Sequence, residues 1–143
     1  MKFRLAVPAV AVALAVGLGS LALAPAALAS SAHPQASSVS AEAPAFDASG
    51  TWGITQSNGL HPTVVVSQDA LGNLTGTASV GSTTGTFEQG FVDGTYIEFV
   101  IDWNNGTRGR YIGELGSDRR LSGVGTDLAH PSSQTTWVSN RTF

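Results

Sequence analysis

The chain has 143 residues and no cysteine, and ten acidic side chains outnumber seven basic ones. Lys2 and Arg4 stand at the N-terminus, so removing these two from the seven leaves five basic against ten acidic residues, a net charge of −5. An acidic chain without clustered basic charge is not expected to bind nucleic acid or an anionic membrane surface. The absence of cysteine excludes a disulfide-stabilised fold.

The first segment has the features of a secretory signal peptide. An apolar run follows the two basic residues and extends to Leu28, with small residues at Ala27 and Ala29. This pattern predicts a leader at residues 1–29, cleaved after Ala29 or after Ala32. The alternative is an uncleaved anchor, because roughly 20 apolar residues can span a bilayer. The helix-breaking residues within the run favour cleavage, so we expect a secreted, extracellular, bacterial protein that has no membrane contact once the leader is removed.

Two parts follow the leader. Residues 30–46 are rich in Ser, Ala and Pro without an apolar period, which predicts a disordered spacer. Residues 47–143 contain short β-branched and aromatic segments that recur about every 8–12 residues between turn residues, as in an all-β sandwich or barrel. The predicted strands are 50–56, 63–69, 73–80, 84–92, 95–103, 107–115, 120–128 and 134–143.

The short connections predict that neighbouring strands in the sequence pair in the sheet. Eight such strands leave two exposed edges unless the sheet closes, and closure gives a small, antiparallel, eight-stranded up-and-down barrel. The interior glycines of the predicted strands suit this fold, because strands in a small barrel coil sharply and large interior side chains alternate with small ones.

The fifth and sixth strands can be placed in register from the sequence. A three-residue loop at 104–106, with Gly106 in the left-handed region, pairs Phe99 with Tyr111. A two-residue loop would instead turn Arg108 and Arg110 towards the interior, and burial of two guanidinium groups would be costly. The three-residue loop is therefore predicted.

Several short motifs in this part of the chain resemble the calycin barrels, the group that includes lipocalins and avidins. Gly50-Thr51-Trp52 resembles the opening that both families share. Further matches to the avidin–streptavidin group, in the same order and with similar spacing, are Leu74-Thr75-Gly76-Thr77, Trp103-Asn104-Asn105, Tyr111-Ile112-Gly113, and Trp137 ahead of Arg141-Thr142-Phe143.

The resemblance implies the barrel fold but does not imply biotin binding. Ile54 stands where avidins have a ligand-binding asparagine, and Arg141 stands where they have an aspartate. The tryptophan of the seventh strand has no counterpart, whereas Trp103 and Trp137 fall where the family supplies an apolar wall. A last-strand arginine resembles the lipocalin arrangement, which implies structural roles for Gly50, Trp52 and Arg141, with Arg141 stacked on Trp52.

No conventional catalytic group, metal site or cofactor is predicted. Asp127, His130 and Ser132 are too close in sequence to face one another as a relay, so they indicate a polar turn with an Asx-type hydrogen bond from Asp127. The histidines lack metal-ligand spacing. The acidic residues Glu98, Asp102 and Glu114 are expected on the outer face, beside Arg108 and Arg110, as a solvated ladder of charges.

The aromatic residues suggest either a filled core or a ligand pocket at one open end of the barrel. Gln56, Gln68 and Asp127 are the polar residues expected among the pocket walls. The candidate ligand-binding residues are Trp52, Gln56, Phe99, Trp103, Tyr111, Asp127 and Trp137.

The leading interpretation is a secreted, non-enzymatic barrel that binds a small apolar or amphipathic molecule. One alternative is an interaction module whose partner is an extracellular protein, such as an inhibitor of a secreted hydrolase. In that case loops or residues 30–46 would enter a foreign active site. The other alternative is a cyclase-type enzyme that uses the barrel interior as a shaped cavity.

Overall fold

The computed structural model describes residues 41–143, so the predicted leader and the first part of the predicted spacer lie outside the described residues. The described chain consists of strands and turns. No helix in this range is long and apolar enough to cross a membrane.

All eight predicted strands are present, and their ends lie within a few residues of the predicted positions. The last strand is the largest exception, because residues 140–143 leave the sheet instead of extending it. The strands are β1 (Gly50–Gln56), β2 (Thr63–Gln68), β3 (Leu74–Val80), β4 (Thr83–Asp93), β5 (Tyr96–Trp103), β6 (Arg108–Leu115), β7 (Leu121–Asp127) and β8 (Gln134–Ser139).

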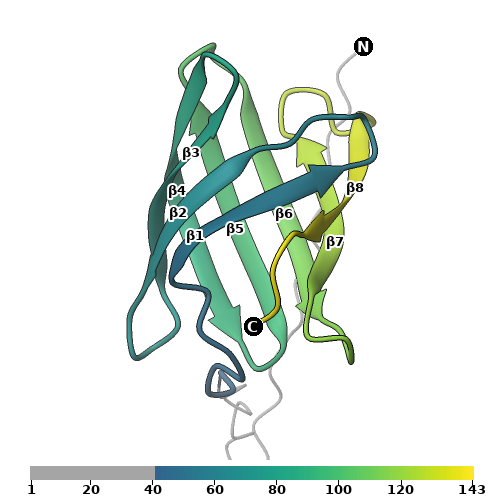
Figure 1. The fold of residues 1–143 in the computed structure, drawn as a ribbon. Coiled ribbons are helices and arrows are strands. Elements are labelled where there is room, and N and C mark those ends of the chain that lie inside the picture. The colour runs from purple at the N-terminus through teal and green to yellow at the C-terminus, as the bar shows by residue number, and fades with distance from the viewer. Residues whose placement is uncertain (1–40) are drawn as a thin grey trace, which may run out of the picture. The chain divides into compact units, whose positions relative to one another are not determined.

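The strands form a closed barrel in which each strand pairs antiparallel with its neighbours in sequence (Figure 1). The last strand returns to the first, with Ile54 opposite Ser139 and Gln56 opposite Trp137. This closure leaves no unpaired sheet edge. The prediction of an all-β, eight-stranded up-and-down barrel is therefore confirmed.

The β5–β6 hairpin has the predicted register. Phe99 lies opposite Tyr111 and Asp102 lies opposite Arg108. Gly106 has a φ of 83° in the connecting turn, a backbone conformation that glycine adopts without steric cost. The three-residue loop keeps both β6 arginines on the outer face.

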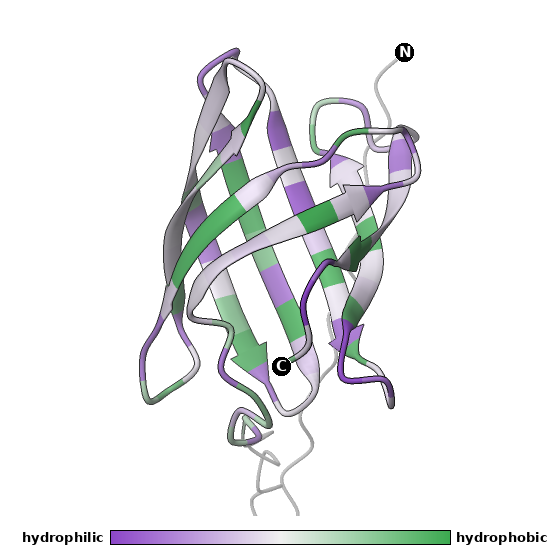
Figure 2. Ribbon diagram, in the orientation of Figure 1, coloured by the Kyte–Doolittle hydropathy of each residue, from purple (hydrophilic) through white to green (hydrophobic). Residues whose placement is uncertain are grey.

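The strand pattern separates an apolar interior from a polar exterior, and apolar and polar positions alternate along the strands in Figure 2. The three tryptophans, Trp52, Trp103 and Trp137, are all buried, as predicted. Phe99 lies near the centre of the core, with its ring stacked on Tyr111 at a centroid distance of 5.0 Å. Aromatic side chains from different strands therefore fill much of the barrel.

The alternation in β4 is interrupted by a bulge that the sequence analysis did not predict. The register against β5 shifts between Phe87 and Gln89, so one extra residue, Glu88, faces outward. Phe87 still stacks on Phe99 at 4.9 Å. The bulge lets the inward positions change from odd to even numbers along β4 without breaking the pairing with β5.

One end of the barrel is covered by the segment that precedes β1. Phe46 is buried and meets Phe143 edge-on at a centroid distance of 5.6 Å. The Ala45 N–H donates to the Gly94 carbonyl at 2.8 Å, and Gln68 donates to the Phe46 carbonyl at 3.1 Å. The last residues of the predicted spacer thus belong to the barrel unit, because they bury apolar surface that the strands leave open.

Candidate functional site

The other end of the barrel holds a pocket of about 650 Å³. It lies among the β1–β2, β3–β4, β5–β6 and β7–β8 connections, at the upper end of Figure 1. Because the barrel is an antiparallel meander, the connections that follow odd-numbered strands all meet at this end. The described segment before β1 (residues 41–49), the remaining connections and the C-terminus lie at the opposite end, which we call the closed end.

The pocket is hollow because inward positions near this end carry small residues. Gly109 and Gly125 lie on either side of the Tyr111 ring and both line the pocket. A methyl group on Gly109 would lie 3.1 Å from Tyr111 Cε2, and one on Gly125 would lie 3.2 Å from Cε1. These two glycines let the tyrosine ring lie close to the barrel wall and leave the space above it open.

Gln56 and Tyr111 contribute the buried polar groups of the pocket. Gln56 Nε2 donates a hydrogen bond to the Tyr111 hydroxyl oxygen at 3.1 Å. Burial raises the pKa of Tyr111, and the hydrogen bond from Gln56 offsets part of this effect. Tyr111 is therefore a neutral phenol at physiological pH, and its ring is held by the stack on Phe99.

Two charged residues line the pocket: Asp127, and Arg108 at the rim, where its side chain lies on the outer face; each bonds to a residue outside the lining. Arg108 forms an ion pair with Glu88 through Nε and Nη2. Asp127 bonds to the His130 ring at 3.1 Å. This bond lowers the pKa of Asp127, with a smaller contribution from the Ala129 N–H. The charge of Arg108 is thus paired with that of Glu88, and the Asp127 carboxylate is already hydrogen-bonded.

The residues around Asp127 form the polar turn that the sequence predicts. Asp127 Oδ1 accepts a hydrogen bond from the Ala129 N–H at 2.9 Å, which is the Asx-type bond. The His130 N–H donates to the Asp127 carbonyl, and the Ser133 N–H donates to the His130 carbonyl. The side chain of His130 is largely exposed. This geometry is that of a local turn at the pocket rim.

Four of the seven candidate ligand-binding residues line the pocket, namely Gln56, Trp103, Tyr111 and Asp127. The other three, Trp52, Phe99 and Trp137, face inward as expected, but they lie in the filled part of the barrel. The structure places these three outside the lining of this pocket, since alternation gives the face of a residue but not its depth along the barrel.

The two tryptophans outside the pocket are held by the surrounding backbone. The Trp137 Nε1–H donates to the Ile112 carbonyl at 3.1 Å, and its ring covers Gly113, where a methyl group would lie 2.6 Å from Cζ2. The Trp52 Nε1–H donates to the Ala48 carbonyl at 3.0 Å. Both rings fill space that would otherwise be part of the hollow interior.

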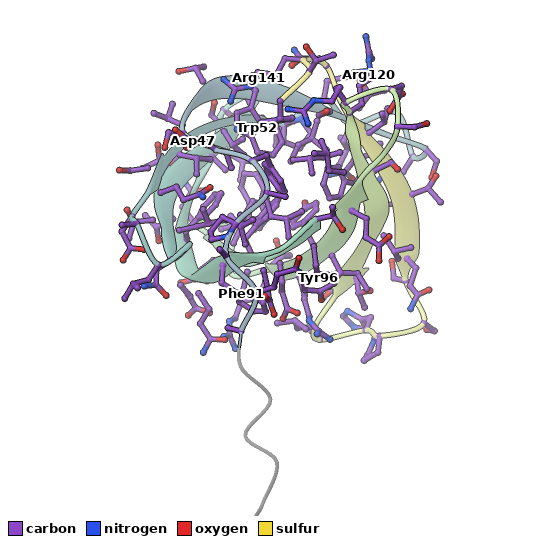
Figure 3. All side chains as sticks on the ribbon, turned by 90° about the horizontal axis from the view of Figure 1, so that it is seen from below. Asp47, Trp52, Phe91, Tyr96, Arg120 and Arg141 are labelled. Carbon is purple, nitrogen blue, oxygen red and sulfur yellow. The ribbon has the colours of Figure 1, made fainter. Side chains whose placement is uncertain are left out.

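Gln68 was also expected in the pocket, and it lies instead at the closed end. Its Oε1 accepts from the Ala48 N–H at 2.9 Å, so it ties β2 to the segment before β1. Gly50 and Arg141 lie at the same end, since a methyl group on Gly50 would be 3.1 Å from Arg141 Nη1. Arg141 does not stack on Trp52 but on Phe143, whose ring meets Trp52 edge-on. Figure 3 shows Arg141 and Trp52 near each other at this end.

Most of the polar residues at the pocket rim are not among the candidates that the sequence predicts. These residues lie in the turns or at the strand ends, where alternation carries no information about direction. The strand order could have predicted them, because in an up-and-down barrel the connections after odd-numbered strands must meet at one end. The missed polar lining residues are Asn58, Ser82, Thr83, Asn105, Thr107, Arg108, Thr126, Ser133, Gln134 and Thr135.

The carboxylates expected on the outer face form part of a charge ladder there. Glu98 accepts from Arg110 Nε at 2.8 Å and from the Tyr96 hydroxyl at 2.7 Å. The bond from Arg110 holds the pKa of Glu98 below its usual range. Asp102 lies opposite Arg108 in the register and is exposed. The outward register that the sequence predicts for these groups is confirmed.

Within residues 41–143, no group of three or more His, Cys, Asp or Glu side chains is arranged to hold a metal ion. The fold and the pocket define a closed eight-stranded barrel of a kind compatible with the calycins, with one open, lined end. No protein-family model matches the sequence, and no curated protein matches it significantly.

Proposed function

We propose that this chain is an exported, non-enzymatic protein that binds a small apolar or amphipathic molecule in the open end of its barrel. The observation that carries the proposal is the pocket of about 650 Å³. Ligand sites are typically clefts of roughly 300–1,000 Å³ with apolar and aromatic walls and a few placed polar groups.

The composition of the wall supports this class of ligand. Trp103 and Tyr111 supply aromatic surface, while Leu60 and Pro62 from the β1–β2 connection and Val80 at the end of β3 supply aliphatic surface. The polar residues cluster at the rim and around one buried hydrogen-bonded pair. Such a wall favours a molecule that buries an apolar body and keeps a polar end near solvent.

To test the binding proposal, two single substitutions are each compared with the wild-type protein. Val80→Phe places a larger side chain in the pocket, whereas Val65→Phe makes the same change at a half-exposed, outward position on β2. Each protein is expressed from the full-length sequence, and whichever form the cell produces is purified, with or without residues 1–29. Binding of decanal and of 2-acetylnaphthalene is then measured by titration calorimetry and by tryptophan fluorescence, because Trp103 alone among the three tryptophans lines the pocket.

We expect saturable binding of at least one probe to the wild type and to Val65→Phe. Val80→Phe should weaken that binding by about tenfold or more, which corresponds to about 1.4 kcal/mol. Absence of saturable binding to the wild type, or equal binding by both variants, would contradict the proposal.

Export is tested separately by mass spectrometry of the protein recovered from the culture medium. Cleavage after Ala29 or Ala32 would support it. A chain that stays with the cells and keeps residues 1–29 would contradict it.

A further inference from the structure

The buried pair at the base of the pocket has an unused hydrogen-bond donor. The Tyr111 hydroxyl oxygen accepts from Gln56 Nε2 at 3.1 Å, so the hydroxyl hydrogen is left to donate elsewhere. Among the described residues, no acceptor takes this hydrogen, and both side chains are buried. Because a buried donor without a partner is unfavourable, this hydroxyl is prepared to bond to a ligand.

Packing around the tyrosine ring fixes the position of the hydroxyl group in the pocket. Tyr111 stacks on Phe99 with an interplanar angle of 10° and meets Trp137 edge-on at 6.5 Å. Gly109 and Gly125 flank the ring edges closely. A ring held on several sides loses little further conformational entropy when it bonds to a ligand, so its hydroxyl can discriminate between ligands.

The charged residues that line the pocket offer no free positive charge to a ligand. Arg108 is engaged by Glu88, and Asp127 is engaged by His130 and by a backbone N–H of its own turn. An anionic ligand would lose its hydration on entering and gain no free counter-ion, which is unfavourable. The wall therefore favours an uncharged molecule over an anion.

We propose that the pocket selects an uncharged, largely apolar molecule that presents a hydrogen-bond acceptor, such as a carbonyl oxygen or ring nitrogen, to the Tyr111 hydroxyl. This inference rests on the proposed function and adds the ligand class to it. Tyr111 is the specificity-determining residue. Gln56 is a positioning residue, because it occupies an acceptor site of the hydroxyl and thereby turns the hydroxyl hydrogen away from itself.

The test compares three probes of similar shape by titration calorimetry. 2-Acetylnaphthalene carries a carbonyl oxygen, 2-isopropenylnaphthalene has a methylene group in its place, and 2-naphthoate adds a negative charge. For the wild-type protein we expect the ketone to bind about tenfold more tightly than the alkene, since one hydrogen bond is worth roughly that factor. The naphthoate should bind more weakly than either.

Three substitutions separate the effect of the Tyr111 hydroxyl on ligand affinity from the effect of the pocket shape. Tyr111→Phe removes the hydroxyl alone and should abolish the preference for the ketone, while the alkene affinity stays within about twofold. Tyr96→Phe is the matched control, because Tyr96 bonds to Glu98 on the outer face and should leave both affinities unchanged. Gln56→Met should lower the ketone affinity more than the alkene affinity and so reduce their ratio, a result that a purely structural role would not give.

The outcomes distinguish the two proposals. If none of the probes binds to the wild type, and decanal does not bind either, the proposed function itself fails. If the ketone and the alkene bind equally, or Tyr111→Phe retains the preference, the inference about the acceptor fails while the binding function stands. Binding of the naphthoate as tight as that of the ketone would overturn the inference that the ligand is uncharged.

Discussion

The guanidinium carbon of Arg141 lies 4.4 Å from the ring centroid of Phe143, and the same ring meets Trp52 edge-on at 5.4 Å. Arg141 Nη2 also donates to the Ser49 carbonyl at 2.9 Å. The residues after β8 are thereby joined to the start of β1. This contact closes one end of the barrel where the strands themselves no longer pair.

Arg141→Ala should lower the free energy of unfolding by about 2 kcal/mol, because it removes a charge-assisted hydrogen bond and a cation–π contact. Arg141→Lys should recover part of the loss, since lysine keeps the charge but not the planar fork. Urea denaturation followed by tryptophan fluorescence measures both. Thr142→Ala, at the exposed neighbouring position, is the control and should change stability by less than about 0.5 kcal/mol. An Arg141→Ala variant as stable as the control would contradict the structural role.

Phe46→Ala should destabilise the barrel by about 3 kcal/mol, because it removes a buried aromatic ring that packs on Phe143. Leu71→Ala is the comparison, since Leu71 is 82% exposed and its truncation should cost little. Thermal unfolding of the two variants, followed by circular dichroism, gives the difference. Equal melting temperatures would show that the segment before β1 does not stabilise the barrel.

Gly106→Ala should cost roughly 1–2 kcal/mol, because its φ of 83° is unfavourable for an L-residue with a Cβ atom. Apart from Gly106 and its two chain neighbours, no residue has an atom within 4 Å of the position that the Cβ would occupy, so the cost would come from the local backbone conformation and not from contacts with the rest of the barrel. Gly106→Asn should cost less, since asparagine tolerates the left-handed region better than alanine. Urea midpoints of the three proteins should follow the order Gly, Asn, Ala, and an alanine variant as stable as the wild type would disprove this explanation.

The two tyrosines of the chain, Tyr96 and Tyr111, should resist ionisation in the folded protein. Burial, together with the hydrogen bond to Glu98 and the charge of Glu98, raises the pKa of Tyr96 to about 12. Burial also raises the pKa of Tyr111 above its ordinary value of 10.0. Because both pKa values are higher in the folded state, the associated stability is complete below pH 10 and is lost as the pH rises through the folded pKa values.

Absorbance at the tyrosinate wavelength tests this prediction. The native protein should show little tyrosinate at pH 10, while the protein in concentrated urea should be about half ionised there. Tyr96→Phe leaves Tyr111 as the remaining chromophore, so the two contributions can be separated. Half-ionisation of the native wild-type protein near pH 10 would contradict the raised pKa values of Tyr96 and Tyr111.

The strands and the β5–β6 register were predictable because they depend on local rules. Strand alternation repeats every two residues, and the turn at Gly106 is set by a few neighbouring residues. The cost of burying Arg108 and Arg110 then selected one register from two. The bulge at Phe87 and Gln89 was not predictable, because an extra residue in a strand becomes visible only against its paired partner.

The packed segment around Phe46 was also missed. Its composition resembles that of a linker, and nothing in its own sequence indicates that the barrel end beside it is uncovered. Its burial depends on Phe143 and on Gly94, which lie far away in the chain.

Outside the bulged strand β4, the sequence by itself determined which side chains face the barrel interior, because that choice follows from alternation along each strand. The tertiary structure alone decided which of those side chains line the pocket. Trp103 and Tyr111 border the pocket, whereas Trp137 fills its part of the interior by lying over Gly113. Height along a barrel axis depends on the tilt and stagger of all eight strands together, and no single strand carries that information.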